Sequence, residues 1–435
     1  MRILFFADPV SPRLKYIAEH ILNNMLGFDV LFTRNIDELS TFSGPKICYS
    51  LNKNNDSIQI SPHGLLSLNE IFKQSFAFYR WRELPIFFQT NPENDIPFDI
   101  FSASFYLISR YEEYSPLELD VHGRYRVEES LAYQNSFLNI PLVDLWAREL
   151  GKIIEFKYPG VKVKPPQFTF IPTIDIDNAY AYKHKGFVRS TLGMANSLFR
   201  LRLNEMGKRL GVHLNLMADP YDTYNKLLEL LANTPQAKWF ILGGHFCKFD
   251  RNISPEKPAM RDLLKRIANN FEVGMHPSYG SGAAIERVRD EMLLLEKVLG
   301  KKITSSRQHF LKVSLPHTYR ILAELGISHD YSMGYSNAIG FRASTCIPYK
   351  FYDLKDEKEL PLTLVPFQAM DRALLNSFQK EPKSVVKESI QLAERAKVVG
   401  GTFVIVWHNE SLSGTNEWKG WERTLGDIVE GVSVL

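Results

Sequence analysis

The sequence predicts an α/β protein. We expect a distorted (β/α)7 barrel in residues 166–435, preceded by an N-terminal α+β domain in residues 1–165. A chain of 435 residues is long enough for two or three domains. Pro165-Pro166 interrupts the chain, and the pattern changes there. Beyond it, helical stretches alternate with seven apolar, β-rich runs: Phe168–Ile176, Trp239–Leu242, Phe271–Met275, Ile303–Ser306, Ile327–Tyr331, Leu362–Pro366 and Thr402–Trp407. Such alternation indicates a parallel sheet with crossover helices, and seven strands fit a closed or nearly closed barrel.

The first 165 residues mix short strands with helices. Ile3–Ala7 is predicted to be a buried strand, and Pro12 stands where the first turn of a helix tolerates proline. That helix continues through the periodic run Leu14–Leu26. Two further runs, Phe98–Glu113 and Leu142–Glu155, have apolar residues at helical spacing. No catalytic constellation is found in this part of the chain.

Composition and charge exclude several classes of protein. The net charge is only +3, from 52 Lys and Arg against 49 Asp and Glu, whereas nucleic-acid binding by bulk charge needs a clear basic excess. The three cysteines are too far apart to suggest a disulfide framework or a CxxC metal site, which favours a reducing compartment. No apolar run is long enough for a signal peptide or a membrane span. We therefore expect a cytoplasmic protein without a membrane span; the oligomeric state is left open.

Unusual polar residues follow the predicted strands. In Thr173-Ile-Asp175-Ile-Asp177, alternation along a strand places both aspartates on one face. Two carboxylates at that separation repel each other unless they share a proton or a cation. A helix cap is the alternative explanation, and it accounts for one aspartate more easily than for both.

Three other strand ends carry complementary side chains. His276 follows the run FEV, and imidazole with carboxylate suits zinc and similar ions. Arg307 could hold one aspartate ionised and oriented. His408 follows the run TFVIV, where it could act as a general acid, and Asp330 could orient its imidazole. The alternative for His276 is a purely structural histidine, and the alternatives for Arg307 are a surface salt bridge and a helix cap.

The order of these residues resembles a known family. Residues 168–435 resemble the polysaccharide deacetylases of carbohydrate esterase family four, which have a distorted seven-stranded β/α barrel. The whole chain resembles members from Bacteroidetes-type bacteria with an N-terminal domain of unknown function, through FDIFSASFYLISRYEEY and DVHGRYRVEESLAY. The resemblance implies these roles: Asp175 as general base, Asp177 and His276 as metal ligands, Arg307 as the group that steadies the base, Asp330 as the acidic residue of the fourth motif and His408 as general acid.

The chain departs from the family pattern at two positions. Gly280 stands where the second histidine of the metal motif is expected, and His309 replaces a proline two residues after the motif arginine. We hypothesise that His309 supplies the missing imidazole from a neighbouring strand end. With that ligand, the site is expected to hold a divalent metal, most simply zinc.

The expected function is a hydrolase that acts on C–N bonds other than peptide bonds. It removes N-acetyl groups from a carbohydrate or glycan precursor, with metal-activated water and an Asp/His acid–base pair. One alternative is an amidase acting on a different C–N bond. The other is a carbohydrate-binding relative with a degenerate site, which would bind sugar without metal or turnover. Of the remaining histidines, His245 is the best candidate for contact with substrate, because it also follows a predicted strand.

Overall fold

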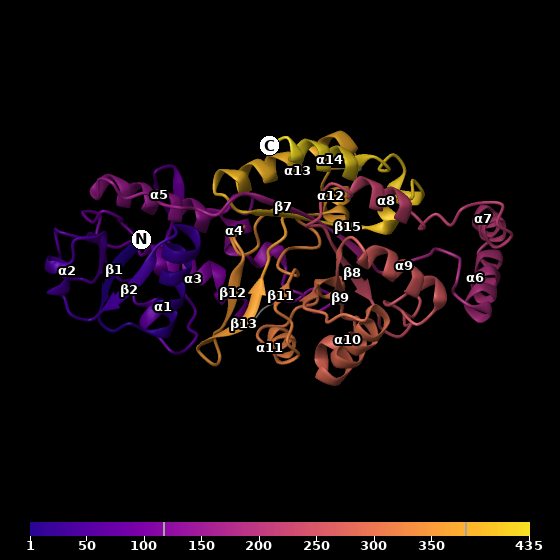
Figure 1. The fold of residues 1–435 in the computed structure, drawn as a ribbon, viewed down its shortest axis with the longest axis horizontal. Helices are drawn as coiled ribbons and strands as arrows, with labels where there is room; N and C mark the ends of the chain where they lie inside the picture. The colour runs from indigo at the N-terminus through magenta and orange to yellow at the C-terminus, as the bar shows by residue number, and fades with distance from the viewer. Residues whose placement is uncertain (116–117, 379–380) are drawn as a thin grey trace.

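The computed structural model describes residues 1–115, 118–378 and 381–435, and it contains two separate large sheets (Figure 1). The larger sheet has nine strands in the order β12-β13-β11-β10-β9-β8-β7-β15-β14. In chain order these are β7 Thr169–Ile176, β8 Lys238–Leu242, β9 Glu272–His276, β10 Ser305–Ser306, β11 His329–Asp330, β12 Tyr349–Asp353, β13 Lys358–Leu364, β14 Ala369–Met370 and β15 Thr402–His408. Each of the seven predicted runs overlaps one of these strands.

The predicted alternation of strands and helices is present, but the sheet departs from a regular seven-stranded barrel in two respects. The sheet has nine strands, and within the described residues its end strands β12 and β14 are not hydrogen-bonded to each other. β12 pairs antiparallel with β13, whereas every other neighbouring pair is parallel. The sequence pattern missed β12 and β14 because β14 has two residues and β12 joins β13 through a short turn without an intervening helix. The fold is mixed α/β.

Helices connect the parallel strands, as the crossover rule requires. In this part of the chain they are α6 Phe187–Phe199, α7 Leu203–His213, α8 Tyr224–Leu230, α9 Pro258–Ala268, α10 Ile285–Leu299, α11 His317–Glu324, α12 Asp371–Ser377, α13 Pro382–Val398 and α14 Thr424–Ser433. α13 and α14 lie together above the sheet in Figure 1, and α9 and α10 lie beside β8 and β9. The pair α6 and α7 is the exception, since it stands away from the sheet.

The N-terminal segment has a parallel sheet instead of the predicted α+β arrangement. Its order is β2-β1-β3-β4, from β1 Arg2–Ala7, β2 Asp29–Thr33, β3 Lys46–Tyr49 and β4 Ile58–Ile60, and all three pairings are parallel. An antiparallel pair, β5 Tyr79–Trp81 with β6 Leu84–Ile86, lies outside it. The helices are α1 Pro12–Glu19, α2 Glu38–Thr41, α3 Ile100–Ile108, α4 Leu131–Gln134 and α5 Leu142–Lys157. α1 and α2 carry the chain back between β1, β2 and β3, whereas a segment without a helix joins β3 to β4.

The two parts of the chain share a buried ionic cluster. Arg110, just after α3, pairs with Glu113 at 2.7 Å, and Glu113 pairs with Arg342 of the C-terminal part at 2.7 Å. Burial raises the pKa of Glu113, but the two arginines outweigh it and the pKa lies below the usual range. Asp144 of α5 also accepts the backbone N–H of Cys346 at 2.8 Å. The RYEE stretch thus serves contact between the two parts of the chain.

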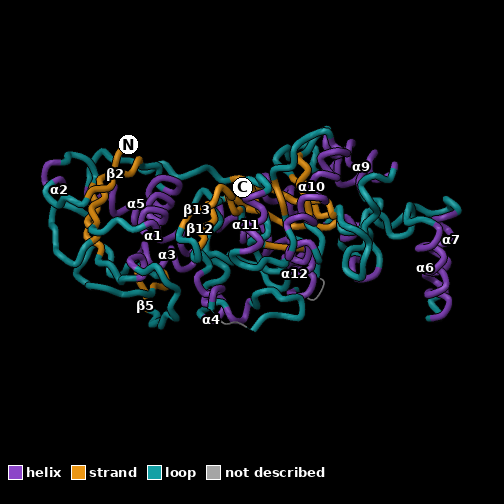
Figure 2. Tube along the Cα trace, turned by 90° about the horizontal axis from the view of Figure 1, so that it is seen from below, coloured by secondary structure: helices purple, strands orange, loops and turns teal. Residues whose placement is uncertain are grey.

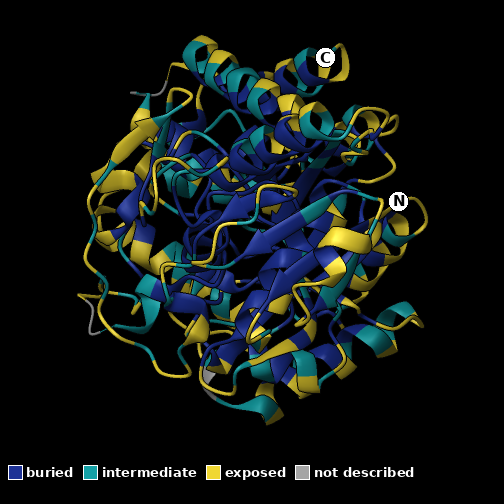
Figure 3. Ribbon diagram, turned by 90° about the vertical axis from the view of Figure 1, so that its left-hand side faces the viewer, coloured by how far each residue is buried: buried dark blue, intermediate teal, exposed yellow. Residues whose placement is uncertain are grey.

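Burial follows the sheets. The strands inside the molecule are buried, and exposed residues gather on loops and outer helix faces (Figure 3). β15 is buried at six consecutive positions, which is typical of a parallel strand covered on both faces. Across the described residues, we find no helix with the length and apolar character needed to traverse a bilayer.

Candidate metal centre

Polar side chains from several strands meet at one edge of the nine-stranded sheet. β7 ends with Asp175 and Ile176, and Asp177 follows directly; its neighbour β15 ends at His408. His276 ends β9, and Arg307 follows β10. Because the carboxyl ends of parallel strands lie on the same side of a sheet, residues from positions 175 to 408 come together there. This sequence prediction of convergence agrees with the structure.

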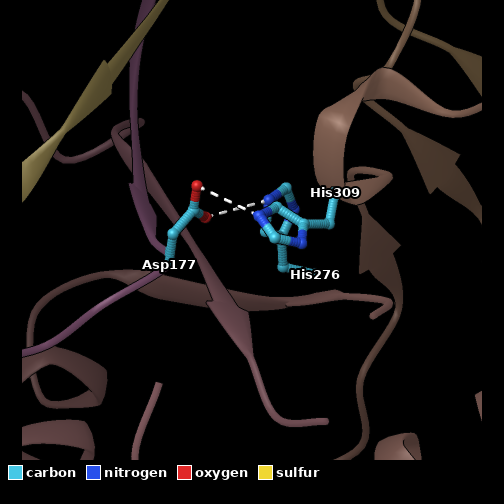
Figure 4. Close-up of side chains that lie close together, drawn as sticks. All are labelled: Asp177, His276 and His309. Atoms are coloured by element: carbon cyan, nitrogen blue, oxygen red, sulfur yellow. Dashed lines mark ion pairs between the residues drawn. The ribbon is translucent and has the colours of Figure 1, made fainter. Parts of the chain in front are cut away.

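Asp177, His276 and His309 form a compact cluster (Figure 4). The Nε2 atom of His276 lies 3.1 Å from Oδ1 of Asp177, and Nε2 of His309 lies 3.3 Å from Oδ2. Both imidazoles are buried, whereas the Asp177 side chain is 30% exposed. The cluster is therefore enclosed on the histidine side and open on the aspartate side. His309 occupies the place predicted for it, on the short 3-10 turn His309–Leu311 after β10.

The outer nitrogen of each imidazole is committed to an acceptor. His276 Nδ1 bonds the carbonyl oxygen of Arg307, and His309 Nδ1 bonds Oδ1 of Asp250 at 2.9 Å. A carbonyl and a carboxylate can only accept, so each Nδ1 carries the hydrogen. When the rings are neutral, each Nε2 therefore presents a lone pair towards Asp177. Partners of this kind fix the tautomer of metal-binding histidines, and two nitrogens with a carboxylate fit a divalent cation such as zinc.

The charges of the cluster also favour a cation. Burial raises the pKa of Asp177, but His309 and His276 outweigh it, and the pKa lies well below its ordinary value. Burial lowers the pKa of His309, but Asp177 and Asp250 outweigh it and raise the pKa to about 9. Without another cation, a proton on His309 balances the carboxylates at neutral pH. A divalent ion between the same three side chains would take over that role and release the proton.

Asp175 is held by an arginine, as predicted. Arg307 is fully buried and donates from one nitrogen to Oδ1 of Asp175 at 2.8 Å and to the Thr173 hydroxyl at 2.7 Å. Its Nε–H donates to the carbonyl of Tyr331, and its guanidinium lies 4.5 Å from the ring centre of Phe240. These contacts fix the arginine, which in turn fixes the carboxylate. Oδ2 of Asp175 is left facing His276 Nε2 at 3.9 Å, beside the cluster.

His408 completes the group, but its predicted partner was wrong. Its Nδ1 bonds both oxygens of Asp371, at 2.9 and 3.0 Å, and its Nε2 lies 3.6 Å from Asp177. Burial lowers the pKa of His408, but Asp371 above all, with Asp177 and Asp175, raises it to about 10. The imidazole is therefore protonated at neutral pH and oriented by Asp371.

Asp330 does not contact His408. Its carboxylate accepts from the Ser306 hydroxyl at 2.8 Å and from the hydroxyl and backbone N–H of Ser332, both at 2.9 Å. These bonds join the ends of β10 and β11, next to Arg307. Burial raises the pKa of Asp330. The correction has a simple cause: β11 lies on the far side of β10 and β9 from β7, whereas β14, which precedes Asp371, pairs with β15.

Two acids that bond histidines of the site escaped the sequence prediction. Asp250 lies in the loop after β8, and Asp371 begins α12 directly after the two-residue strand β14. Asp371 directly follows a strand end, which is the signal that could have identified it, whereas Asp250 lies eight residues after β8. His245, named as a candidate for substrate contact, is exposed in the loop after β8 and is not part of the cluster.

The N-terminal segment contributes to the rim of the centre. His122 from the DVHGRYR stretch bonds the Tyr279 hydroxyl through Nδ1 at 3.2 Å and packs on the ring of Phe310 at 4.9 Å. Arg124 donates to the carbonyl oxygen of Phe310 at 2.9 Å. Phe310 is the neighbour of His309 in the chain. This loop therefore supports the turn that positions a cluster histidine.

Comparison with known families gives one match. Residues 3–159 match the sequence model of a family of unknown function (DUF7033). No curated protein matches the chain.

Solved structures similar to this chain include two described as polysaccharide deacetylases and one described as a CE4 family pseudoenzyme. A putative polysaccharide deacetylase from Mycobacterium smegmatis is 17% identical, with a TM-score of 0.41 over 62% of this chain and 85% of that one. A probable polysaccharide deacetylase from Pseudomonas aeruginosa is 11% identical, with a TM-score of 0.36 over 62% and 85%. A CE4 family pseudoenzyme from Bacillus anthracis is 11% identical, with a TM-score of 0.33 over 62% of each chain. Because these identities and TM-scores are low, the proposed function is argued from the side chains of this protein.

Proposed function

We propose that the protein is a metal-dependent hydrolase that removes N-acetyl groups from a carbohydrate or glycan precursor. The observation that carries the proposal is the pair of imidazoles, His276 and His309, whose Nε2 atoms converge on Asp177 while their Nδ1 atoms are bonded to acceptors. Asp175 and His408 flank this cluster, and each is oriented by a buried partner. A purely structural ion cluster would not need a free carboxylate oxygen and a protonated imidazole on its open side.

The cation would be held by Asp177, His276 and His309. A divalent ion such as zinc supplies Lewis acidity, which lowers the pKa of water and polarises an acyl carbonyl. Asp175 is the base, because Arg307 bonds one oxygen and orients the carboxylate while the other oxygen faces the cluster. Asp175 takes the proton of the attacking water as that water adds to the carbonyl carbon.

His408 acts as the acid. An amine leaves poorly unless it receives a proton as the C–N bond breaks. His408 is protonated at neutral pH, and Asp371 directs its Nε2–H towards the open side of the cluster. The products are acetate and a free amino sugar.

A large cavity has the volume for a substrate of glycan size. It has a volume of about 1290 Å³, and its lining includes Asn178, next to Asp177, together with Tyr182 and Tyr221. This volume exceeds that of an ordinary small-molecule site, which is about 300–1,000 Å³. The choice of carbohydrate as substrate rests on the motif resemblance of Asp175, Asp177 and the later strand-end residues.

Metal analysis and acetate release test the proposal together. Protein purified without chelator should contain about one divalent ion per chain and release acetate from N-acetylhexosamine oligomers. His309→Ala should lose both the metal and the activity, whereas His329→Ala, which changes an exposed histidine outside the cluster, should keep both. Full metal content in His309→Ala contradicts the ligand set. Metal binding with hydrolysis of other amides but no acetate release would favour an amidase on a different C–N bond.

A further inference from the structure

Residues 183–217 form a helical hairpin that projects from the body of the protein. Figures 1 and 2 show α6 and α7 side by side at the end of the molecule farthest from the N-terminal sheet. The base of the hairpin is tied by Asp219, which is buried and accepts the backbone N–H groups of Ala181, Tyr182 and Lys183 at 2.8–2.9 Å. The arm is therefore anchored at both of its ends.

Among the described residues, the hairpin exposes more large apolar side chains than any other segment of its length. Across the described residues, nineteen large apolar side chains are more than half exposed, and eleven of them belong to this 35-residue hairpin. Phe187 and Phe199 are 83% and 89% exposed, and Leu201 and Leu216 are 80% and 77% exposed. A helix on a protein in water normally turns its apolar stripe towards the core. A contiguous exposed apolar surface instead marks an interaction site.

The same hairpin is strongly basic. Residues 183–217 contain seven Lys or Arg and one acidic residue, Glu205, a net charge of +6. The whole chain has a net charge of only +3, so the remainder is net negative. Most of these cations are near the exposed apolar side chains, as in Phe199-Arg200-Leu201-Arg202-Leu203. Exposed apolar side chains and cations thus occur together in the same hairpin.

We propose that this hairpin attaches the protein to the surface of a bilayer that contains anionic lipids. Helices of 13 and 11 residues are too short to cross the hydrocarbon core, which needs about 20. A basic helix with bulky apolar residues lies in the headgroup region, with its apolar side chains in the upper acyl chains and its cations at the phosphates. A second copy of the chain is a poorer occupant, because two hairpins of charge +6 repel each other.

The attachment has a consequence for the large cavity that Asn178, the residue after Asp177, helps to line. That cavity is lined by Asn178, by Lys185 at the base of the hairpin and by Lys208 and Arg209 of α7. The hairpin begins six residues after Asp177. Attachment through α6 and α7 therefore holds the cavity close to the membrane surface. The proposal itself does not depend on catalysis.

Sedimentation with vesicles tests the proposal. The full-length protein is mixed with phosphatidylcholine vesicles that either contain or lack phosphatidylglycerol, and the bound fraction is measured at low and high salt. We expect binding to the phosphatidylglycerol vesicles, with a loss at high salt because ions screen the attraction. Phe187→Ser with Phe199→Ser should weaken the partition about tenfold or more, since both rings leave water on binding.

Two further variants separate the contribution of the cations to vesicle binding from that of the exposed phenylalanines. Arg200→Gln with Lys208→Gln should weaken binding to anionic vesicles roughly tenfold or more and leave the apolar surface in place. Phe156→Ser changes a ring on α5 that is also 89% exposed and should leave binding unchanged. Unfolding temperature and circular dichroism should be the same for all variants, because these side chains are exposed.

Three results would overturn the proposal. The first is an absence of binding to phosphatidylglycerol vesicles by the parent protein. The second is an equal loss of binding in Phe156→Ser and in the double phenylalanine variant. The third is a concentration-dependent dimer that the double variant dissociates, without vesicle binding by the parent, which would assign the surface to a second copy of the chain.

Discussion

Replacing Asp371 with asparagine tests which acid orients His408. Asp371 contacts Nδ1 with both oxygens at 2.9 and 3.0 Å, and it is the strongest of the groups that raise the pKa of His408 from 6.5 to about 10. Removing its charge should return the pKa towards the ordinary value. At a pKa near 6.5 only about a tenth of the imidazole is protonated at pH 7.5, so kcat there should fall about tenfold.

The assay is the pH profile of kcat for acetate release, measured on protein of equal metal content. The alkaline limb should move to lower pH in Asp371→Asn, because the acid loses its proton earlier. Asp330→Asn is the matched control, since Asp330 is also a buried acid at a strand end but bonds Ser306 and Ser332. An alkaline limb that moves in Asp330→Asn and stays in place in Asp371→Asn would refute the assignment.

The contact between His408 and Asp371 also predicts how the stability of the protein depends on pH. The folded-state pKa of His408 is raised, so the pair stabilises the native state fully below about pH 6.5, and this contribution is lost as the pH rises towards about 10. The unfolding temperature of the metal-free parent should therefore fall over this range. Asp371→Asn should show a smaller fall, and an identical pH dependence in parent and variant would contradict the argument.

Three further predictions concern the metal ligands and the contact between the two parts of the chain. Because metal must displace a proton from His309, whose pKa is about 9, affinity should rise about tenfold per pH unit from pH 7 to 9, and calorimetry in two buffers should record about one proton released per ion; affinity independent of pH would contradict this. Asp250→Asn should weaken metal binding about 10–100-fold, as measured by chelator competition, because His309 loses the acceptor that fixes its tautomer; unchanged affinity would make that hydrogen bond irrelevant. Glu113→Ala should lower the free energy of unfolding by about 3–5 kcal/mol in urea titration, since it leaves Arg110 and Arg342 buried without that partner; a loss below about 1 kcal/mol would show that water reaches them.

The local sequence pattern was sufficient to predict most strands of the larger sheet and many residues of the site. The buried run that became β15 is recognisable because a parallel strand covered on both faces is continuously apolar. The run that became β7 is recognisable as a short β-rich stretch between helical ones. Asp175 and His408 could be placed because they lie at the ends of those runs, and strand ends on one edge of a parallel sheet converge. His309 could be proposed because it stands two residues from Arg307, at the end of the same short strand.

The hydrogen-bond partners required the tertiary structure. Asp250 and Asp371 reach the histidines from loops and from a helix start, and no spacing rule ties these acids to residues 59 and 37 positions away. Asp330 was assigned to His408 although β11 and β15 are separated in the sheet by four other strands. Strand order decides which end residues are neighbours, and it is a property of the whole sheet.

The sequence by itself determined the mixed α/β class, the carboxylates and imidazoles available for a metal, and the order in which they follow the strands. Only the tertiary structure decided that the larger sheet has nine strands, which acids hold His309 and His408, and that α6 and α7 turn apolar side chains to water. The physical reason is that periodicity reports which face of an element is apolar. It does not report what covers that face, because covering depends on contacts between segments far apart in the chain.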